Sequence, residues 1–228
     1  MQDIPVRNKE LLNILNKYRD LLTRDKDQFV EDFHRSCKEQ KDNRHWLVGD
    51  GHLQEILDQG DRHEGFPDYM YGYEMSVNRK KHQFFKEDTH PTIRRDRTAE
   101  ISNINRLITQ FLGVRTTALT AYYPPGGFIS WHNNANASAY NLIFTWSEEG
   151  KGQFDYVDPR SKEVVSMPDK VGWQCKAAYF GNYGEKDRLF YHCAKTDCWR
   201  LTVSFTFDTS SMSESYRAEL IDEISSEE

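Results

Sequence analysis

The stretch 122–134, YYPPGGFISWHNN, joins two short apolar runs through a Pro-Pro-Gly-Gly turn and ends on a histidine followed by two amides. Aromatic and β-branched residues on both sides of such a turn predict two consecutive strands. His132 stands at the end of the second strand, and Asn134 follows where the chain leaves it. The residues around this stretch decide whether the imidazole is a ligand or merely a polar residue at a strand end.

Further strands are expected on both sides of this pair. Eight short segments rich in strand-forming residues follow one another, and Gly, Pro, Asn or Asp bounds each of them. Their approximate ranges are 115–123, 127–132, 138–146, 152–157, 163–167, 171–180, 188–194 and 198–208. Eight strands at this spacing predict a double-sheet jelly roll, also called a double-stranded β-helix.

Helical periodicity dominates the first part of the chain. Apolar residues recur every three or four positions over 11–22, over 29–37 and over 98–112. Thr98 is a candidate N-cap for the last of these helices, and Gly113 is its expected stop. These patterns predict helices whose apolar faces pack against a sheet.

The chain is expected to form one α+β domain over 1–228. A helical and mixed N-terminal region, 1–114, supports one sheet of a jelly-roll core over 115–208. Within that N-terminal region we predict loops with short elements over 39–97, because Gly, Asp, Pro and His interrupt every periodic run of apolar residues. The remainder, 209–228, predicts a short C-terminal helix with an acidic tail.

The 228-residue chain carries a formal charge of −6, with 13% aromatic and 29% charged residues. A mean hydropathy of −0.82 beside so many aromatic residues indicates a polar surface around an aromatic core. The negative charge counts against a dedicated nucleic-acid binder. Segment 79–97 is the exception, with seven basic against three acidic residues, and we interpret it as a solvated loop or a surface for an anionic partner.

The four cysteines are irregularly spaced, and no apolar segment typical of a secretion signal opens the chain. No apolar run reaches the roughly 18 residues that a membrane span requires. We therefore expect a cytoplasmic protein with reduced thiols and no membrane partner.

Two histidines and one arginine form the constellation that predicts chemistry. His132 ends the second expected strand and His192 lies in the seventh, and a jelly roll can bring these strands together. Two neutral imidazoles, usually with one carboxylate, hold the iron of mononuclear non-haem Fe(II) oxygenases. On the eighth strand Arg200 and Thr202 share a face, and a guanidinium fork beside a hydroxyl suits the distal carboxylate of a 2-oxoacid. The phenol of Tyr123 offers a further donor.

The pattern Tyr123-Pro-Pro-Gly, His132-x-Asn134, His192 and Arg200-x-Thr202 resembles the Fe(II)/2-oxoglutarate-dependent dioxygenase superfamily, whose order is Tyr-x-x-Gly, His-x-Asp, a distal His and Arg-x-Ser/Thr. The resemblance covers about 115–208. It is similar to the branches that include alkylated-nucleobase demethylases and prolyl hydroxylases, and to members predicted in tailed phages.

The resemblance implies a jelly roll with helices outside one sheet and the hydroxylation of a C–H bond. The metal ligands that it implies are His132, Asn134 and His192, binding Fe(II). It likewise implies that the cosubstrate 2-oxoglutarate is held by Arg200, Thr202 and Tyr123.

Asn134 stands where the family places its metal carboxylate. An amide is neutral, so the exchange removes a negative charge beside the cation and weakens its binding. Three outcomes follow for position 134: ligation through the amide oxygen, an open position for water or halide as in the family's halogenases, or a degenerate site. The alternative function is therefore a non-catalytic jelly-roll binding or structural module. The substrate of an enzyme, whether protein, nucleic acid or metabolite, and the oligomeric state stay open.

Other residues carry weaker signals. Asp155 and Asp158 are interpreted as polar residues of a hairpin end. Cys193 and Cys198 flank the distal histidine, yet one Cys-x4-Cys is little support for zinc. Asn141 is suggested to donate a hydrogen bond to one of the metal-ligating side chains without touching the metal itself. Surface or capping roles are expected for the remaining histidines, which are His34, His45, His52, His63, His82 and His90.

Overall fold

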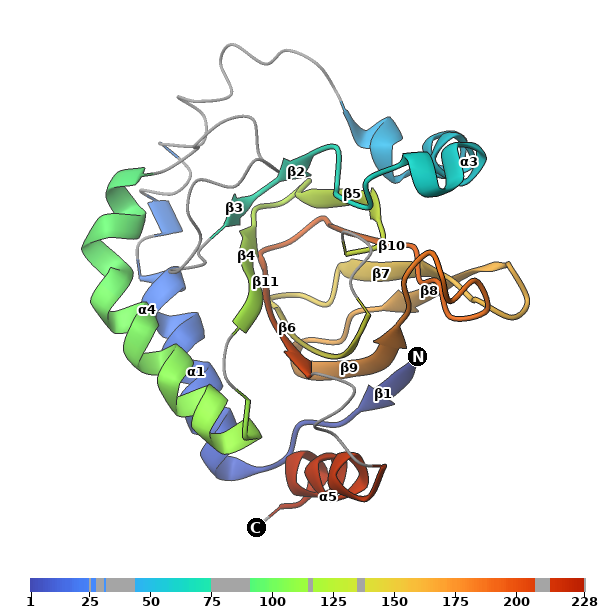
Figure 1. Cartoon of the computed structure of the whole chain (residues 1–228). Coiled ribbons are helices and arrows are strands. Elements are labelled where there is room, and N and C mark those ends of the chain that lie inside the picture. Colours follow the sequence, from blue (N-terminus) through green and yellow to red (C-terminus); the bar gives the residue numbers. More distant parts are fainter. Residues whose placement is uncertain are drawn as a thin grey trace.

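The computed structural model describes residues 1–24, 26–27, 31, 44–74, 91–114, 117–134, 138–207 and 214–227. Its centre consists of two antiparallel sheets that pack face to face, with the helices outside them (Figure 1). The six-stranded sheet has the order β1 (Gln2–Ile4), β9 (Gly172–Phe180), β6 (Ala139–Ser147), β11 (Arg200–Phe207), β4 (Thr117–Tyr123) and β3 (Tyr73–Glu74). The five-stranded sheet has the order β2 (Met70–Tyr71), β5 (Phe128–His132), β10 (His192–Thr196), β7 (Gly152–Val157) and β8 (Val164–Pro168).

The eight strands expected from the sequence correspond to β4 through β11, with bounds that differ by a few residues. The largest difference is in β10, which begins at His192 rather than at 188. The short strands β1, β2 and β3 were not expected, and they extend the edges of both sheets. Segments of two or three residues are too short to display the alternation by which strands are recognised.

The helices α1 (Lys9–Thr23) and α4 (Pro91–Leu112) lie on the outer face of the six-stranded sheet (Figure 1). Their apolar stripes meet the outward side chains of β6, β9 and β11 in one buried cluster. The Asn8 side chain caps α1 by accepting from the Leu11 amide at 3.0 Å. The helix α5 (Glu214–Ser225) closes the end of this layer next to β1.

The structure moves the expected start of α4 and confirms its expected end. Thr98 is not an N-cap, because α4 begins seven residues earlier at Pro91, a residue that the first turn of a helix tolerates. Gly113 ends α4 as expected, with a φ of 65° that favours glycine. The helix expected over 29–37, apart from residue 31, and the side chains of segment 79–97 lie outside the described residues.

Smaller elements cover the five-stranded sheet. The 3-10 turn His45–Val48, the helix α3 (Asp50–Gln59) and the 3-10 turn Gly60–Arg62 follow one another along the chain. Apolar residues of this segment pack on Phe128 and Trp131, which face away from the second sheet. Among the residues that the structure describes, no helix combines the length and hydropathy needed to cross a bilayer.

Candidate metal centre and buried charge cluster

His132 and His192 lie side by side between the sheets. His132 ends β5, His192 begins β10, and the register of these neighbouring strands places the two residues opposite each other. Their ring centroids are 4.1 Å apart, and both side chains are buried. The structure thus brings together two imidazoles that are sixty residues apart in the sequence.

A bulge in β5 aims the first of these rings. His132 pairs with His192, but Ile129 pairs with Ala194, so three steps along β5 match two steps along β10. An extra residue of this kind shifts the alternation of side chains by one position. Ile129 and His132 consequently both face the interior, whereas the intervening Trp131 packs outside. Simple alternation would have placed Ile129 and His132 on opposite faces.

Main-chain carbonyls select the tautomer of both rings. Nδ1 of His132 lies 2.8 Å from the carbonyl oxygen of Ser130, and Nδ1 of His192 lies 3.2 Å from that of Phe190. A carbonyl oxygen only accepts, so each Nδ1 carries the proton and each Nε2 keeps its lone pair. Both rings therefore present the nitrogen that a metal ion binds, held in place by a partner behind it.

Burial keeps both imidazoles neutral. It lowers the pKa of His132 to about 4, and it lowers the pKa of His192 well below its ordinary value, with His132 adding to the effect. Phe154 stacks on the His192 ring at 5.3 Å between centroids, and Phe180 lies 4.8 Å from it. Neutral imidazole in an apolar, water-poor environment is the form that ligates transition metals.

The third expected metal ligand, Asn134, is a neutral amide rather than an imidazole or a carboxylate. Asn134 lies just beyond β5 with a φ of 60°, a left-handed conformation that asparagine adopts more readily than most residues. The preceding Asn133 is buried, and its amide donates to the Gly65 carbonyl at 3.2 Å. Within the described ranges, no three His, Cys, Asp and Glu side chains gather as a metal site. From the described residues, a bound metal ion would thus have two imidazoles and, at most, one neutral amide.

The carboxylates and thiols near the expected metal ligands make other contacts. The Asp155 carboxylate accepts from Gln153 at 2.7 and 2.8 Å, and Asp158 caps a turn by accepting from two main-chain amides at 2.9 Å. Cys193 packs in the cluster on the outer side of the five-stranded sheet. Cys198 lies 3.3 Å from the Ser147 hydroxyl. These contacts explain the four residues without a metal.

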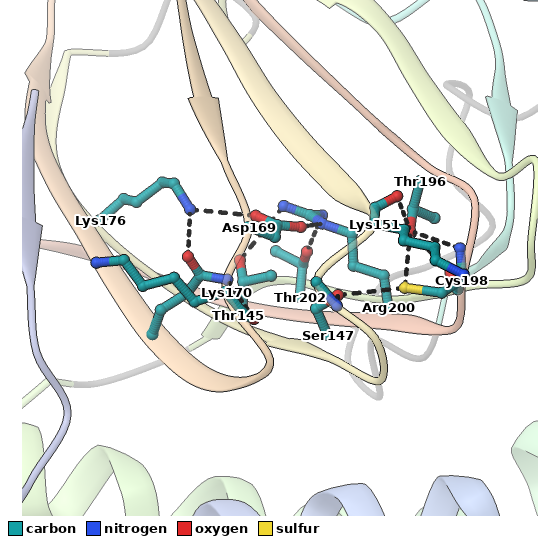
Figure 2. Close-up of polar contacts among 12 residues, drawn as sticks. Thr145, Ser147, Lys151, Asp169, Lys170, Lys176, Thr196, Cys198, Arg200 and Thr202 are labelled. Carbon is teal, nitrogen blue, oxygen red and sulfur yellow. Dashed lines mark hydrogen bonds and ion pairs between the residues drawn. The ribbon is translucent and has the colours of Figure 1, made fainter.

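Arg200 begins β11 and is fully buried between the sheets (Figure 2). Its Nη1 donates to the Thr202 hydroxyl at 2.6 Å, its Nη2 reaches the Thr145 hydroxyl at 3.4 Å, and the guanidinium lies 5.8 Å from the Tyr123 ring centroid. The three residues expected to hold a cosubstrate are thus neighbours. The Nε of Arg200, however, donates to the Asp169 carboxylate at 2.7 Å.

Asp169 and Lys176 complete a buried charge cluster that the sequence interpretation missed. The second oxygen of Asp169 lies 3.2 Å from the Lys176 ammonium, which also donates to Gln174 at 3.1 Å (Figure 2). Lys176 and Arg200 are each only 1% exposed. One sequence signal pointed to this cluster: a charged residue, Lys176, stands between Cys175 and Ala177 in the middle of an expected strand.

The local chain makes room for the Asp169 carboxylate. Asp169 lies in the turn between β8 and β9, and its amide donates to the Gly152 carbonyl at 2.8 Å. A Cβ atom on Gly152 would lie 2.4 Å from the carboxylate, so a residue without a side chain is needed there. Burial alone would raise the pKa of Asp169, but the adjacent Arg200 and Lys176 outweigh it and hold the pKa below its ordinary value.

The imidazole pair and the charge cluster both lie in the buried space between the two sheets. His192 begins β10, and Thr196, which ends it, leads to Arg200 four residues later. The side chains of Ala121 and Ala194 belong to the apolar cluster between the sheets. Both groups are buried between the sheets.

No protein-family model matches the chain, and no curated protein does. Among solved structures, the Pseudomonas putida prolyl-4-hydroxylase matches with a TM-score of 0.30 and 14% identity, over 68% of this chain and 82% of that one. The 2-oxoglutarate complex of a viral collagen prolyl hydroxylase from Paramecium Bursaria Chlorella virus-1 gives 0.30 and 11%, over 70% and 91%. Drosophila melanogaster CENP-C bound to CAL1 gives 0.27 and 10%, over 39% of this chain and only 60% of its own. Similarities this weak assign no activity, so the function rests on the side chains themselves.

Proposed function

We propose that this protein is an Fe(II)- and 2-oxoglutarate-dependent oxygenase that hydroxylates a C–H bond of a substrate not yet identified. The observation that carries the proposal is the imidazole pair of His132 and His192, with each Nδ1 bonded to a main-chain carbonyl. Since each Nδ1 carries the proton, Nε2 of each ring is the nitrogen that can ligate a metal ion.

The strand order supports a double-stranded β-helix as the scaffold. Consecutive strands from β4 to β7 alternate between the two sheets, and so do those from β8 to β11. A jelly roll interleaves its strands in this way. The same interleaving makes β5 and β10 neighbours, which is what the imidazole pair requires.

The residues present fit an iron ion with an incomplete protein ligand set. His132 and His192 would hold it through Nε2, and Asn134 would contribute a neutral amide oxygen or leave a position to the cosubstrate. Bound iron with 2-oxoglutarate supplies the oxidation, in which O2 places one atom in the new hydroxyl group and the other in succinate as CO2 leaves. The protein orients the ligands and keeps water out through the aromatic rings around His192.

Arg200 would bind the distal carboxylate of 2-oxoglutarate. A guanidinium has five N–H groups, and Arg200 uses three of them within the described part of the chain. One N–H on each Nη nitrogen is left for a ligand oxygen. Thr202 and Thr145 hold the guanidinium plane in a single orientation, and Tyr123 lies over it.

Anaerobic titration with Fe(II) and 2-oxoglutarate tests this proposal. Chelation of the 2-oxoacid by bound iron is expected to produce a charge-transfer band in the visible region, and His132→Ala should abolish it. His52→Ala is a matched control, because this histidine is also buried but contacts Glu55 and Asp68 instead. A wild-type protein that stays colourless at saturating metal and cosubstrate contradicts the proposal.

A non-catalytic binding or structural module is the second candidate, and two observations favour it. No three-residue metal group exists among the described residues. Asp169 already neutralises part of the charge on Arg200. A module of this kind would bind no Fe(II), and its melting temperature would be the same with and without added metal.

A further inference from the structure

A third histidine lies close to the imidazole pair. His63 belongs to the segment between α3 and β2, and it is only 7% exposed. The amide of Asn133, the residue directly after His132, donates to the Gly65 carbonyl at 3.2 Å. In addition, the Tyr183 hydroxyl donates to the His63 carbonyl. The first bond fastens the segment that carries His63 to the end of β5, and the second fastens it to the loop between β9 and β10.

The hydrogen bonds of His63 select the opposite tautomer from that of the pair. Its Nδ1 accepts from the Gly65 amide at 3.2 Å. An amide N–H only donates, so Nδ1 keeps its lone pair, and the proton of the neutral ring is on Nε2. Burial lowers the pKa of His63, which favours this neutral ring. His132 and His192 thus present a lone pair on Nε2, whereas His63 presents an N–H group there. His63 is suited to donate a hydrogen bond, not to ligate a metal ion.

The Nε2–H group of His63 has no acceptor in the part of the chain that the structure describes. The contacts of this residue use its main-chain amide, its carbonyl and Nδ1. Polar groups in residues this enclosed generally have a hydrogen-bond partner. The ring is also near the pair: burial lowers the pKa of His132 most, and His63 is close enough to lower it further. An acceptor for Nε2–H is therefore to be sought among ligands of a metal at the pair.

We propose that His63 is a positioning residue, which donates a hydrogen bond from Nε2 to an anionic oxygen ligand of the metal ion held by His132 and His192. This inference rests on the proposed function, because it requires a metal ion at the imidazole pair. Two imidazoles and the Asn134 amide neutralise none of the charge of a divalent cation. A carboxylate oxygen is then favoured as the remaining ligand, and a hydrogen bond to a charged oxygen is stronger than one to a neutral oxygen.

Formate binding to the Co(II)-loaded protein tests this inference without turnover. Co(II) absorbs in the visible region, and its spectrum changes when a ligand of the metal is exchanged. Formate has a single carboxylate, and only formate that alters the surroundings of the metal contributes to the spectral change. A titration at constant ionic strength therefore gives a dissociation constant for the ligand position beside the imidazole pair.

His63→Asn and His63→Gln separate hydrogen-bond donation from packing. The oxygen of the shorter amide can accept from the Gly65 amide as Nδ1 does, but asparagine offers no donor at the place of Nε2. The amide nitrogen of glutamine reaches that place. We expect His63→Asn to weaken formate binding about tenfold to a hundredfold, the range for a hydrogen bond to a charged group. His63→Gln should retain most of the wild-type affinity.

Co(II) itself should bind equally well to the wild type and to both variants, because His63 is not a ligand. His45→Asn is the matched control, since its ring packs on Phe128 at 5.1 Å between centroids and formate affinity should not change. A His63→Asn variant that binds formate as tightly as the wild type overturns the inference. An equal loss of affinity in His63→Gln also overturns it, because packing would then explain both losses. Loss of Co(II) binding in both variants contradicts it as well, since His63 would then belong to the structure that holds the metal.

The same titrations distinguish this inference from the proposed function. If the wild type binds no Co(II), the proposed function and the role of His63 fail together. If Co(II) binding depends on His132 but formate affinity does not depend on His63, the proposed function stands and only the role of His63 fails.

Discussion

Replacing Asp169 by asparagine leaves two cations facing each other in the protein interior. Asparagine keeps the size of the side chain but loses the charge that holds Arg200 Nε at 2.7 Å and Lys176 Nζ at 3.2 Å. Solvent does not screen these groups, because their side chains are at most 2% exposed. Breaking a buried ion pair by removing one partner costs about 3 to 5 kcal/mol. Out of a typical stability of about 5 to 15 kcal/mol, this is a large fraction.

Urea unfolding monitored by circular dichroism measures this loss. We expect Asp169→Asn to lower the free energy of unfolding by about 3 to 5 kcal/mol at neutral pH, and the melting temperature by about 6 to 20 °C. Adding Lys176→Met removes the uncompensated ammonium, so the double variant should recover about 1 to 3 kcal/mol through the coupling of the two sites.

The pH dependence gives an independent check. The pKa of Asp169 is lower in the folded state, so its contribution to stability is present above the unfolded-state pKa of about 3.9 and is lost as the pH falls through the folded value. The difference between wild type and Asp169→Asn should therefore be constant near neutral pH and shrink below about pH 4. A loss smaller than about 1 kcal/mol, without rescue by Lys176→Met, would refute the view that these charges depend on one another.

Three further outcomes are expected. Gly152→Ala should cost about 1 to 3 kcal/mol in urea unfolding, because its Cβ would meet the Asp169 carboxylate at 2.4 Å; a stability equal to wild type would show that the turn adjusts freely. Asn134→Asp should tighten Co(II) binding by at least about tenfold if position 134 ligates the metal, since a charged oxygen replaces a neutral one, and an unchanged dissociation constant would remove it from the site. His132 has a folded-state pKa of about 4, below the unfolded value of 6.5, so between these pH values the unfolded state binds more protons and stability falls as the pH is lowered. The wild type should therefore lose about 3 kcal/mol more than His132→Phe on going from pH 7 to pH 4, and parallel stability curves would contradict the buried neutral ring.

Much of the scaffold could be predicted from local sequence patterns. The eight strands from β4 to β11 were expected close to their observed bounds, because alternating side chains and the turns between them are properties of neighbouring residues. The apolar stripes of α1 and of the second half of α4 were visible for the same reason. The start of α4 was missed because residues 91–97 carry charges in place of a continued apolar stripe.

The residues of the candidate site were likewise predicted from local patterns, but their orientation was not. His132, His192 and Arg200 were chosen from spacing and residue type, and the structure places all three between the sheets. What spacing did not show is the bulge in β5 that turns His132 inward, since a bulge depends on the register of two strands far apart in the chain.

The sequence by itself determined which segments become strands and which side chains alternate on each of them. Only the tertiary structure decided that Asp169 meets Arg200, thirty-one residues further along the chain, and Lys176 in one buried cluster. The reason is physical: alternation is set by adjacent peptide units, whereas the meeting of charges depends on how two sheets pair and pack. The balance of buried charge exists only after that packing.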